Sequence, residues 1–271
     1  MTILKPLRSG RILSEAEALA DLETITTRNT TNHSNSTPTI EPVATQQSDY
    51  VHIPGSAFSR ELIEHYKAPE LNFNFENGLY VAKKRIQKTN PIIEAGRKLG
   101  FDLSARAENC GFLGQINWHE AKQIVEQGLQ GRILTPALYF PVLKWAEANN
   151  TDLAKDLVNY AEWLDAVTKE GAKNQKARFL VHTDKDLNGG KDYGKVVLAE
   201  DKYFDYEDID TNSGLPKILK DTGKFKQWYP ENSPTAAFRN RNDSGPILNL
   251  SRVPGLACEL LGVRVAKIFP R

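Results

Sequence analysis

The residues best suited to chemistry lie near the C-terminus, in the 20-residue stretch from Arg239 to Cys258. Arginine and asparagine side chains supply many hydrogen-bond donors there, and Asp243, Ser244 and Ser251 add acceptors. The order of polar and apolar residues follows neither a helical nor a strand period, so we expect irregular loops. Polar loops held by a rigid scaffold are typical of surfaces that bind a protein or a glycan.

The predicted ligand surface comprises Arg239, Arg241, Asn242, Asn249, Ser251, Arg252, Leu256 and Cys258. The frame predicted to hold it comprises Phe238, Ile247, Leu248, Leu250, Pro254, Leu261 and Val263. The stretch contains no lysine and no aromatic stacking partner, so we expect no specific nucleic-acid partner. An ordinary solvated loop region is the alternative interpretation of the same composition.

A second candidate is a metal site at Asp184, Asp186 and Asn188, which resemble the first half of a calcium loop that ends its turn at Gly189. A bidentate glutamate belongs eleven residues after Asp184, where Lys195 stands. The sequence therefore favours a hairpin turn over a metal site.

Catalytic patterns are scarce. The chain has five histidines without metal-ligand spacing, and it contains no nucleophile elbow, phosphate-binding glycine loop or dinucleotide fingerprint. We therefore predict neither an enzyme nor a cofactor. A Cys258 nucleophile paired with His182 stays an alternative that no local motif supports.

Composition narrows the function classes. Lys plus Arg (35) balances Asp plus Glu (34), so no overall charge attracts nucleic acid or anionic lipid. Two cysteines exclude a disulfide framework and a four-cysteine metal site. No apolar run is long enough for a membrane span. The N-terminus lacks the apolar core of a secretory signal peptide, which predicts a cytoplasmic or virion-associated protein.

Three regions are predicted along the chain. Residues 1–48 indicate a flexible tail, because the part after residue 26 is rich in Thr, Asn, Ser and Pro and poor in apolar residues. Residues 49–75 are interpreted as a connector with a helix over 59–66. Residues 76–271 are predicted to form one globular domain.

Within this domain, helices are expected over about 90–100, 118–128, 135–148 and 152–160, from apolar spacing and from capping residues. Short strands are expected over 78–81, 162–166, 178–182, 195–198 and 263–269. Helices followed by strands predict an α+β fold with segregated elements. The acidic run between Asp205 and Asp210 is interpreted as a solvated loop.

Several short segments resemble the variable proteins of diversity-generating retroelements, of the archaeal and phage type. They are Leu134-Thr135-Pro136, Glu162-Trp163-Leu164-Asp165-Ala166, Gly214-Leu215-Pro216, Trp228-Tyr229-Pro230, Phe238, Pro254 and Leu261-Gly262-Val263-Arg264. The resemblance covers about residues 76–271. It implies a C-type-lectin-like domain, with short antiparallel strands and long loops, that displays mutable residues.

The chemistry of such retroelements allows a check on the sequence. Mutation of adenines in Asn-type codons never yields Lys, Glu, Gln, Met or Trp. These five types make up 54 of 271 residues in the whole chain and none of the 20 between Arg239 and Cys258. The Gly-Gly-Ser-Trp segment of many proteins with this fold is absent. The cysteine pair of the related formylglycine-generating enzymes also has no counterpart near the C-terminus.

The sequence thus predicts a non-enzymatic binding protein whose C-terminal surface recognises a protein or a glycan. One alternative is an enzyme of a formylglycine-generating-like, hydrolytic or oxidative class, using Cys258 or a metal at Asp184 and Asp186. The other is a structural virion or assembly protein with the tail as docking segment.

Overall fold

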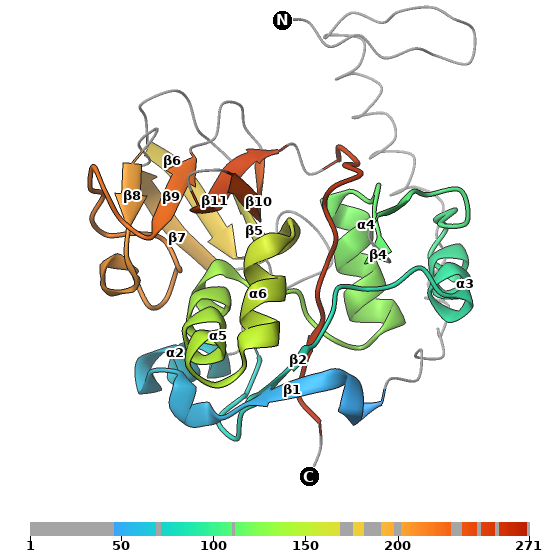
Figure 1. Ribbon diagram of the computed structural model, residues 1–271, viewed down its shortest axis with the longest axis horizontal. Coiled ribbons are helices and arrows are strands. Elements are labelled where there is room, and N and C mark those ends of the chain that lie inside the picture. Colours follow the sequence, from blue (N-terminus) through green and yellow to red (C-terminus); the bar gives the residue numbers. More distant parts are fainter. Residues whose placement is uncertain are drawn as a thin grey trace, which may run out of the picture. The chain divides into compact units, whose positions relative to one another are not determined.

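The computed structural model describes residues 46–68, 72–109, 112–168, 176–181, 191–197, 202–228, 235–242, 245–252 and 255–269 (Figure 1). The chain divides into two units, residues 1–39 and residues 40–271, and every element below belongs to the second. The predicted tail therefore lies almost wholly outside the described residues.

Five α-helices occur in the described residues. They are α2 (Arg60–Lys67), α3 (Asn90–Lys98), α4 (Trp118–Gln123), α5 (Pro136–Asn149) and α6 (Thr151–Asn159). Their starts follow from local capping chemistry, because a side-chain oxygen at the N-cap satisfies an amide of the first turn. Ser59 accepts from the Leu62 amide and Thr135 from the Leu138 amide, at 3.1 and 3.3 Å. All the helices predicted between residues 59 and 160 are confirmed.

The second predicted helix differs in one respect from a regular α-helix. After α4 it widens into the π-helical segment η3 (Ile124–Gly128) and ends at Gly128, as predicted. The helix of residues 90–98 has Thr89 rather than Asn90 at its N-cap.

Twelve strands are present in the described part of the chain. They are β1 (Tyr50–Ile53), β2 (Leu79–Ala82), β3 (Glu108–Asn109), β4 (Phe112–Leu113), β5 (Glu162–Thr168), β6 (Lys176–Val181), β7 (Lys191–Val197), β8 (Lys202–Phe204), β9 (Phe225–Trp228), β10 (Thr235–Asn242), β11 (Gly245–Arg252) and β12 (Ala266–Lys267). Seven of them form one sheet in the order β7-β6-β5-β10-β11-β9-β8. Neighbours are antiparallel except β9 and β11, which run parallel. A smaller sheet has the order β1-β2-β12. The helices and sheets make a mixed α/β fold, which is compatible with the predicted α+β class.

Both faces of β5 are buried, because two apolar clusters meet on this strand. Leu164 and Ala166 belong to a cluster with α2, α5 and α6, whereas Trp163 and Val167 belong to one with α3, α4 and η3. Alternate residues of a strand point to opposite faces, so β5 joins the two halves of the core.

The predicted boundary at residue 76 needs correction. Ile53, Leu62 and Tyr66 are buried in the first cluster, and Phe73 and Phe75 pack with them. Since β1 also pairs with β2, residues 50–68 and 72–75 are part of the packed unit rather than a connector.

The C-terminal segment links the two sheets (Figure 1). Gly262 bonds to the backbone on either side of Glu162, at Ala161 and Trp163, and Ala266 exchanges two bonds with Arg132. On its other side Ala266 pairs with Val81 of β2. The strand predicted over 263–269 is thus only two residues long, yet it is bonded on both sides.

Candidate functional site

The predicted ligand residues are mostly brought together by one β-hairpin. Strand β10 carries Arg239, Arg241 and Asn242, and β11 carries Asn249, Ser251 and Arg252. The pairing is antiparallel and joins Arg239 to Leu248, Arg241 to Pro246 and Asn242 to Gly245. The side chains of Arg239, Arg241, Asn242, Ser251 and Arg252 lie outside the described residues, whereas Asn249 is partly exposed.

The prediction that this stretch is irregular was wrong for residues 239–242 and 245–252, which form two strands. Both strands are eight residues long and occupy interior positions in the seven-stranded sheet. Only residues 243 and 244 separate the paired ends, which is the loop length typical of a tight hairpin. Ile247 and Leu248 are consecutive and both buried, so the polar–apolar alternation that marks a half-buried strand is missing.

The described frame residues are buried, as predicted. Ile247, Leu248, Leu261 and Val263 have at most 4% of their surface exposed. The side chains of Phe238 and Leu250, and all of Pro254, lie outside the described residues.

The last two predicted ligand residues lie on the segment after the hairpin. Leu256 is 40% exposed and nearby Leu260 is 63% exposed, whereas Cys258 is partly buried against the second cluster. The Cys258 carbonyl accepts from the amides of Gln115 and Leu261, at 3.0 and 3.3 Å. The backbone of this segment is therefore anchored, while two large apolar side chains on it face solvent.

A buried ionic network fixes the C-terminal segment to β5 and α6. Arg264 is 1% exposed and its Nη2 donates to Glu162, also 1% exposed, at 2.6 Å and to Asp156. Its Nη1 donates to the Ala82 carbonyl at 2.7 Å. Burial alone would lower the pKa of Arg264, but Glu162 and Asp156 together raise it. One side chain thereby ties β2, β5 and α6 together.

A second arginine borders this network. The Arg85 guanidinium lies 3.1 Å from the ring centre of Phe112 and 3.9 Å from that of Tyr160. Burial lowers the pKa of Arg85 to about 10, although Glu162 and Asp156 act in the opposite direction. Arg85 therefore stays charged at neutral pH, in a cation–π arrangement with the two rings.

The acidic run is more structured than predicted. Asp208 is 6% exposed and binds Lys220 at 2.6 Å, and this bond holds the pKa of Asp208 below its usual value. The Asp205 and Asp208 side chains cap the short 3-10 helix η4 (Tyr206–Asp208), and Asp210 accepts from the amide of Ser213. These carboxylates organise a loop, so the prediction of a merely solvated segment was wrong for Asp208.

The predicted calcium half-loop at Asp184, Asp186 and Asn188 lies outside the described residues, as does His182. In the part of the chain that is described, no group of three or more His, Cys, Asp or Glu could hold a metal ion. No helix in that part is both long and apolar enough to cross a bilayer.

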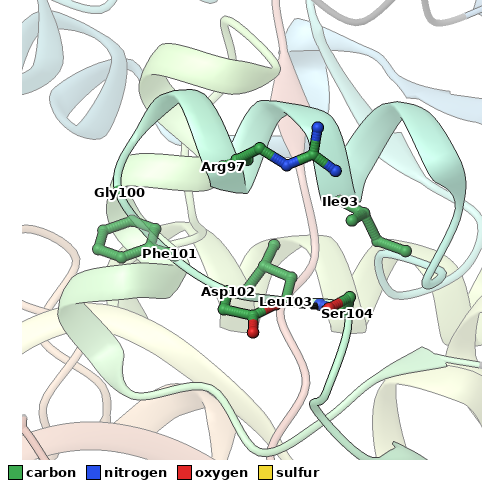
Figure 2. A pocket seen from close by; sticks show the side chains of 7 residues that line it. All are labelled: Ile93, Arg97, Gly100, Phe101, Asp102, Leu103 and Ser104. Atoms are coloured by element: carbon green, nitrogen blue, oxygen red, sulfur yellow. Dashed lines mark hydrogen bonds between the residues drawn. The ribbon is translucent and has the colours of Figure 1, made fainter.

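A shallow hollow lies between α3 and the segment that follows it (Figure 2). It has a volume of about 410 Å³ and is lined by Ile93, Arg97, Gly100, Phe101, Asp102, Leu103 and Ser104. Its charged groups have local partners, because Arg97 binds Glu94 at 2.6 Å and Asp102 accepts from Ser104. Ligand sites need polar groups that converge on the cavity, and this hollow does not provide them.

Sequence reasoning missed two clusters of ion-paired side chains in the core. One joins Arg264 to Glu162 and Asp156, and the other joins Lys122 to Glu126 and Asp165. The sequence does contain a signal for each. Arg264 stands between two valines, and Glu162 and Asp165 interrupt an apolar strand. A charged residue inside an apolar run is expected to be buried together with its neighbours, and a buried charge needs a partner of opposite charge.

No family model matches this sequence, and no curated protein or solved structure was found to resemble the chain.

Proposed function

We propose that this chain is a non-enzymatic binding protein that presents the β10–β11 hairpin and the segment after it to a protein or glycan ligand. We further propose that it is a variable protein of a diversity-generating retroelement with a C-type-lectin-like fold. The retroelement assignment is supported by the sequence landmarks and by the absence of five residue types between Arg239 and Cys258.

The observation that carries the proposal is the contrast between buried and solvent-exposed apolar side chains within one short stretch of the chain. Ile247, Leu248 and Leu261 are almost fully buried, whereas Leu256 and Leu260 expose 40% and 63% of their surface. Exposed large apolar side chains that lie close together in the chain favour an interaction surface over an ordinary solvated loop. If the residues of a binding surface vary, other residues must hold the backbone of that surface in place.

The fixed backbone beneath this surface is a further support. The hairpin has paired strands on both sides, β5 next to β10 and β9 next to β11. The C-terminal segment is bonded to β5 through Gly262 and through Arg264. Substitutions at solvent-facing positions would therefore leave the main-chain pairing intact.

The proposal predicts unequal tolerance to substitution. Arg239→Ser, Asn242→Tyr, Asn249→Asp and Arg252→Gly combined should melt almost like the parent, because surface changes usually cost within about 0.5 kcal/mol each. Leu248→Ala and Leu261→Ala should each cost roughly 2–5 kcal/mol, because each leaves a cavity in the core. Thermal melting of each variant measures the difference.

A library experiment tests display and binding together. One library randomises the eight predicted ligand positions, and a matched one randomises eight buried positions of the same domain. Most members of the first should fold, and selection on purified proteins and on a glycan array should yield binders. Equal loss of folding in the two libraries would refute the display proposal. Catalytic turnover by the parent that the fourfold variant abolishes would favour the enzyme alternative.

A further inference from the structure

Three ionisable side chains meet in the core between α4–η3 and β5. Lys122 donates to Asp165 at 3.0 Å and to Glu126 at 2.6 Å. The side chains of Lys122 and Asp165 are only 5% and 2% exposed, and that of Glu126 is 21% exposed. The Lys122 ammonium also lies 5.8 Å from the Trp118 ring centre. Burial of charges on this scale is costly unless every charge is balanced.

The charges that are in direct contact do not balance. Two carboxylates share one ammonium, whereas Arg132 is partly exposed and acts on both carboxylates through its charge rather than through a hydrogen bond. Among the described residues, no donor binds the buried Oδ1 of Asp165. A carboxylate oxygen without a donor in the core favours the neutral, protonated acid.

The electrostatics point the same way. Burial raises the pKa of Asp165 above its ordinary value, although Lys122 and Arg132 act against it. Burial likewise raises the pKa of Glu126, and the charge of Asp165 adds to this effect. Burial alone would lower the pKa of Lys122, but Asp165 and Glu126 together raise it. The cluster therefore favours binding one proton beyond the lysine's own.

The cluster lies where the β5 backbone leaves its sheet. The pairing of β5 with β10 runs through Trp163 and resumes at Val167. Between these positions the Leu164 carbonyl accepts from the Trp118 indole, and the Asp165 amide donates to the Leu134 carbonyl, both at 2.9 Å. At this point β5 is bonded to Trp118 of α4 and to Leu134, just before α5, instead of to a neighbouring strand.

We propose that Lys122, Glu126 and Asp165 form a pH-sensitive joint between α4–η3 and β5, held closed by one proton that the two carboxylates share. Loss of that proton leaves an excess negative charge in the core and weakens the packing of α4–η3 on β5. The joint depends only on these buried groups and does not require the proposed binding function.

The direction of the pH effect follows from linkage. The unfolded chain releases its carboxyl protons near a pKa of about 4, whereas the folded chain retains one to a higher pH. Between these two values the folded state binds more protons, so stability falls as the pH rises. The contribution is complete below about pH 4 and is lost as the pH passes the raised pKa of the folded state.

The experiment compares the full chain with Asp165→Asn and Glu126→Gln by denaturant unfolding at pH values from mildly acidic to alkaline. From mildly acidic to alkaline pH, the unfolding equilibrium constant of the parent should rise by at least about tenfold more than that of Asp165→Asn, since one pKa unit corresponds to that factor. Asp221→Asn is the matched control, because Asp221 binds Lys202 with its side chain 88% exposed. The control should retain the pH dependence of the parent.

Infrared difference spectroscopy on the unmodified chain supplies a readout that does not depend on any variant folding. A protonated carboxyl band should persist above the pH at which carboxyl groups of the unfolded chain are ionised, a pKa of about 4, and should disappear as the pH rises further. The band should be missing from Asp165→Asn or Glu126→Gln. The same pH dependence in parent and Asp165→Asn, or a carboxyl band in the parent that disappears at the pH at which the unfolded chain ionises, would overturn the proposal.

Discussion

Replacement of Arg264 by methionine is expected to lower the free energy of unfolding by about 3–5 kcal/mol. Methionine retains much of the side-chain volume but leaves Glu162, itself 1% exposed, without its main partner. The Ala82 carbonyl and Asp156 also lose a donor. Because an uncompensated buried carboxylate is costlier than a lost contact, this substitution should cost more than the removal of an exposed ion pair. Chemical denaturation of the purified variant measures the cost.

Two controls separate the charge effect from the packing effect. Arg97→Met removes an arginine of another ion pair whose side chain is 72% exposed, and it should change the melting temperature little. Arg264→Met combined with Glu162→Gln removes the unpaired charge and should recover part of the loss, which a double-mutant cycle quantifies. If Arg264→Met unfolds at the same denaturant concentration as the parent, the network does not fasten the C-terminal segment.

Helices were the part of the fold most accessible from the sequence. Their starts depend on contacts three residues apart, such as Ser59 with Leu62 and Thr135 with Leu138, which a single pass along the chain detects. The apolar spacing that predicted the second helix agrees with the structure, because Trp118, Ala121 and Val125 are all buried. Contacts between residues close together in the chain were therefore sufficient to predict these helices.

The β10–β11 hairpin was missed because the strand beside β10, β5, comes from a distant part of the chain. A strand with one face in water shows alternation, but β11 buries Ile247 and Leu248 in succession. The partner strands β5 and β9 that support this pairing precede the hairpin and could be recognised only in three dimensions. The same limitation hid the role of residues 50–68 and 72–75, whose apolar side chains have partners as distant as α5 and α6.

The buried charges show the limit of sequence reasoning for the site. Arg264 and Glu162 are 102 residues apart, and Lys122 and Asp165 are 43 apart. Each residue alone resembles a solvated surface charge, and only the pairing explains why it is buried. The predicted ligand residues were instead proposed from composition. Composition assigns them to one stretch of the chain but does not predict the secondary structure of that stretch.

Gly214→Ala is expected to have the other large effect, because Gly214 approaches the first turn of α5 closely. Its φ of +73° lies in the left-handed region, which costs an L-residue roughly 1–2 kcal/mol. A Cβ would also lie 2.1 Å from the Ala137 nitrogen and 2.2 Å from the Pro136 carbonyl carbon, both backbone atoms that cannot rotate away. Overpacking of this kind costs typically about 1–3 kcal/mol more, so the melting temperature should fall by roughly 10 °C.

Gly100→Ala provides a matched control for this prediction. Gly100 has a φ of +85°, but an added Cβ there would have no neighbour within 4 Å, so this variant isolates the conformational cost. The difference between the two melting temperatures then measures the close approach of the 205–224 loop to α5. That loop connects β8 to β9, and β9 pairs with β11, so its position on α5 contributes to the support of the hairpin. Equal melting temperatures for the two variants would show that the loop yields freely and that α5 does not fix this edge of the sheet.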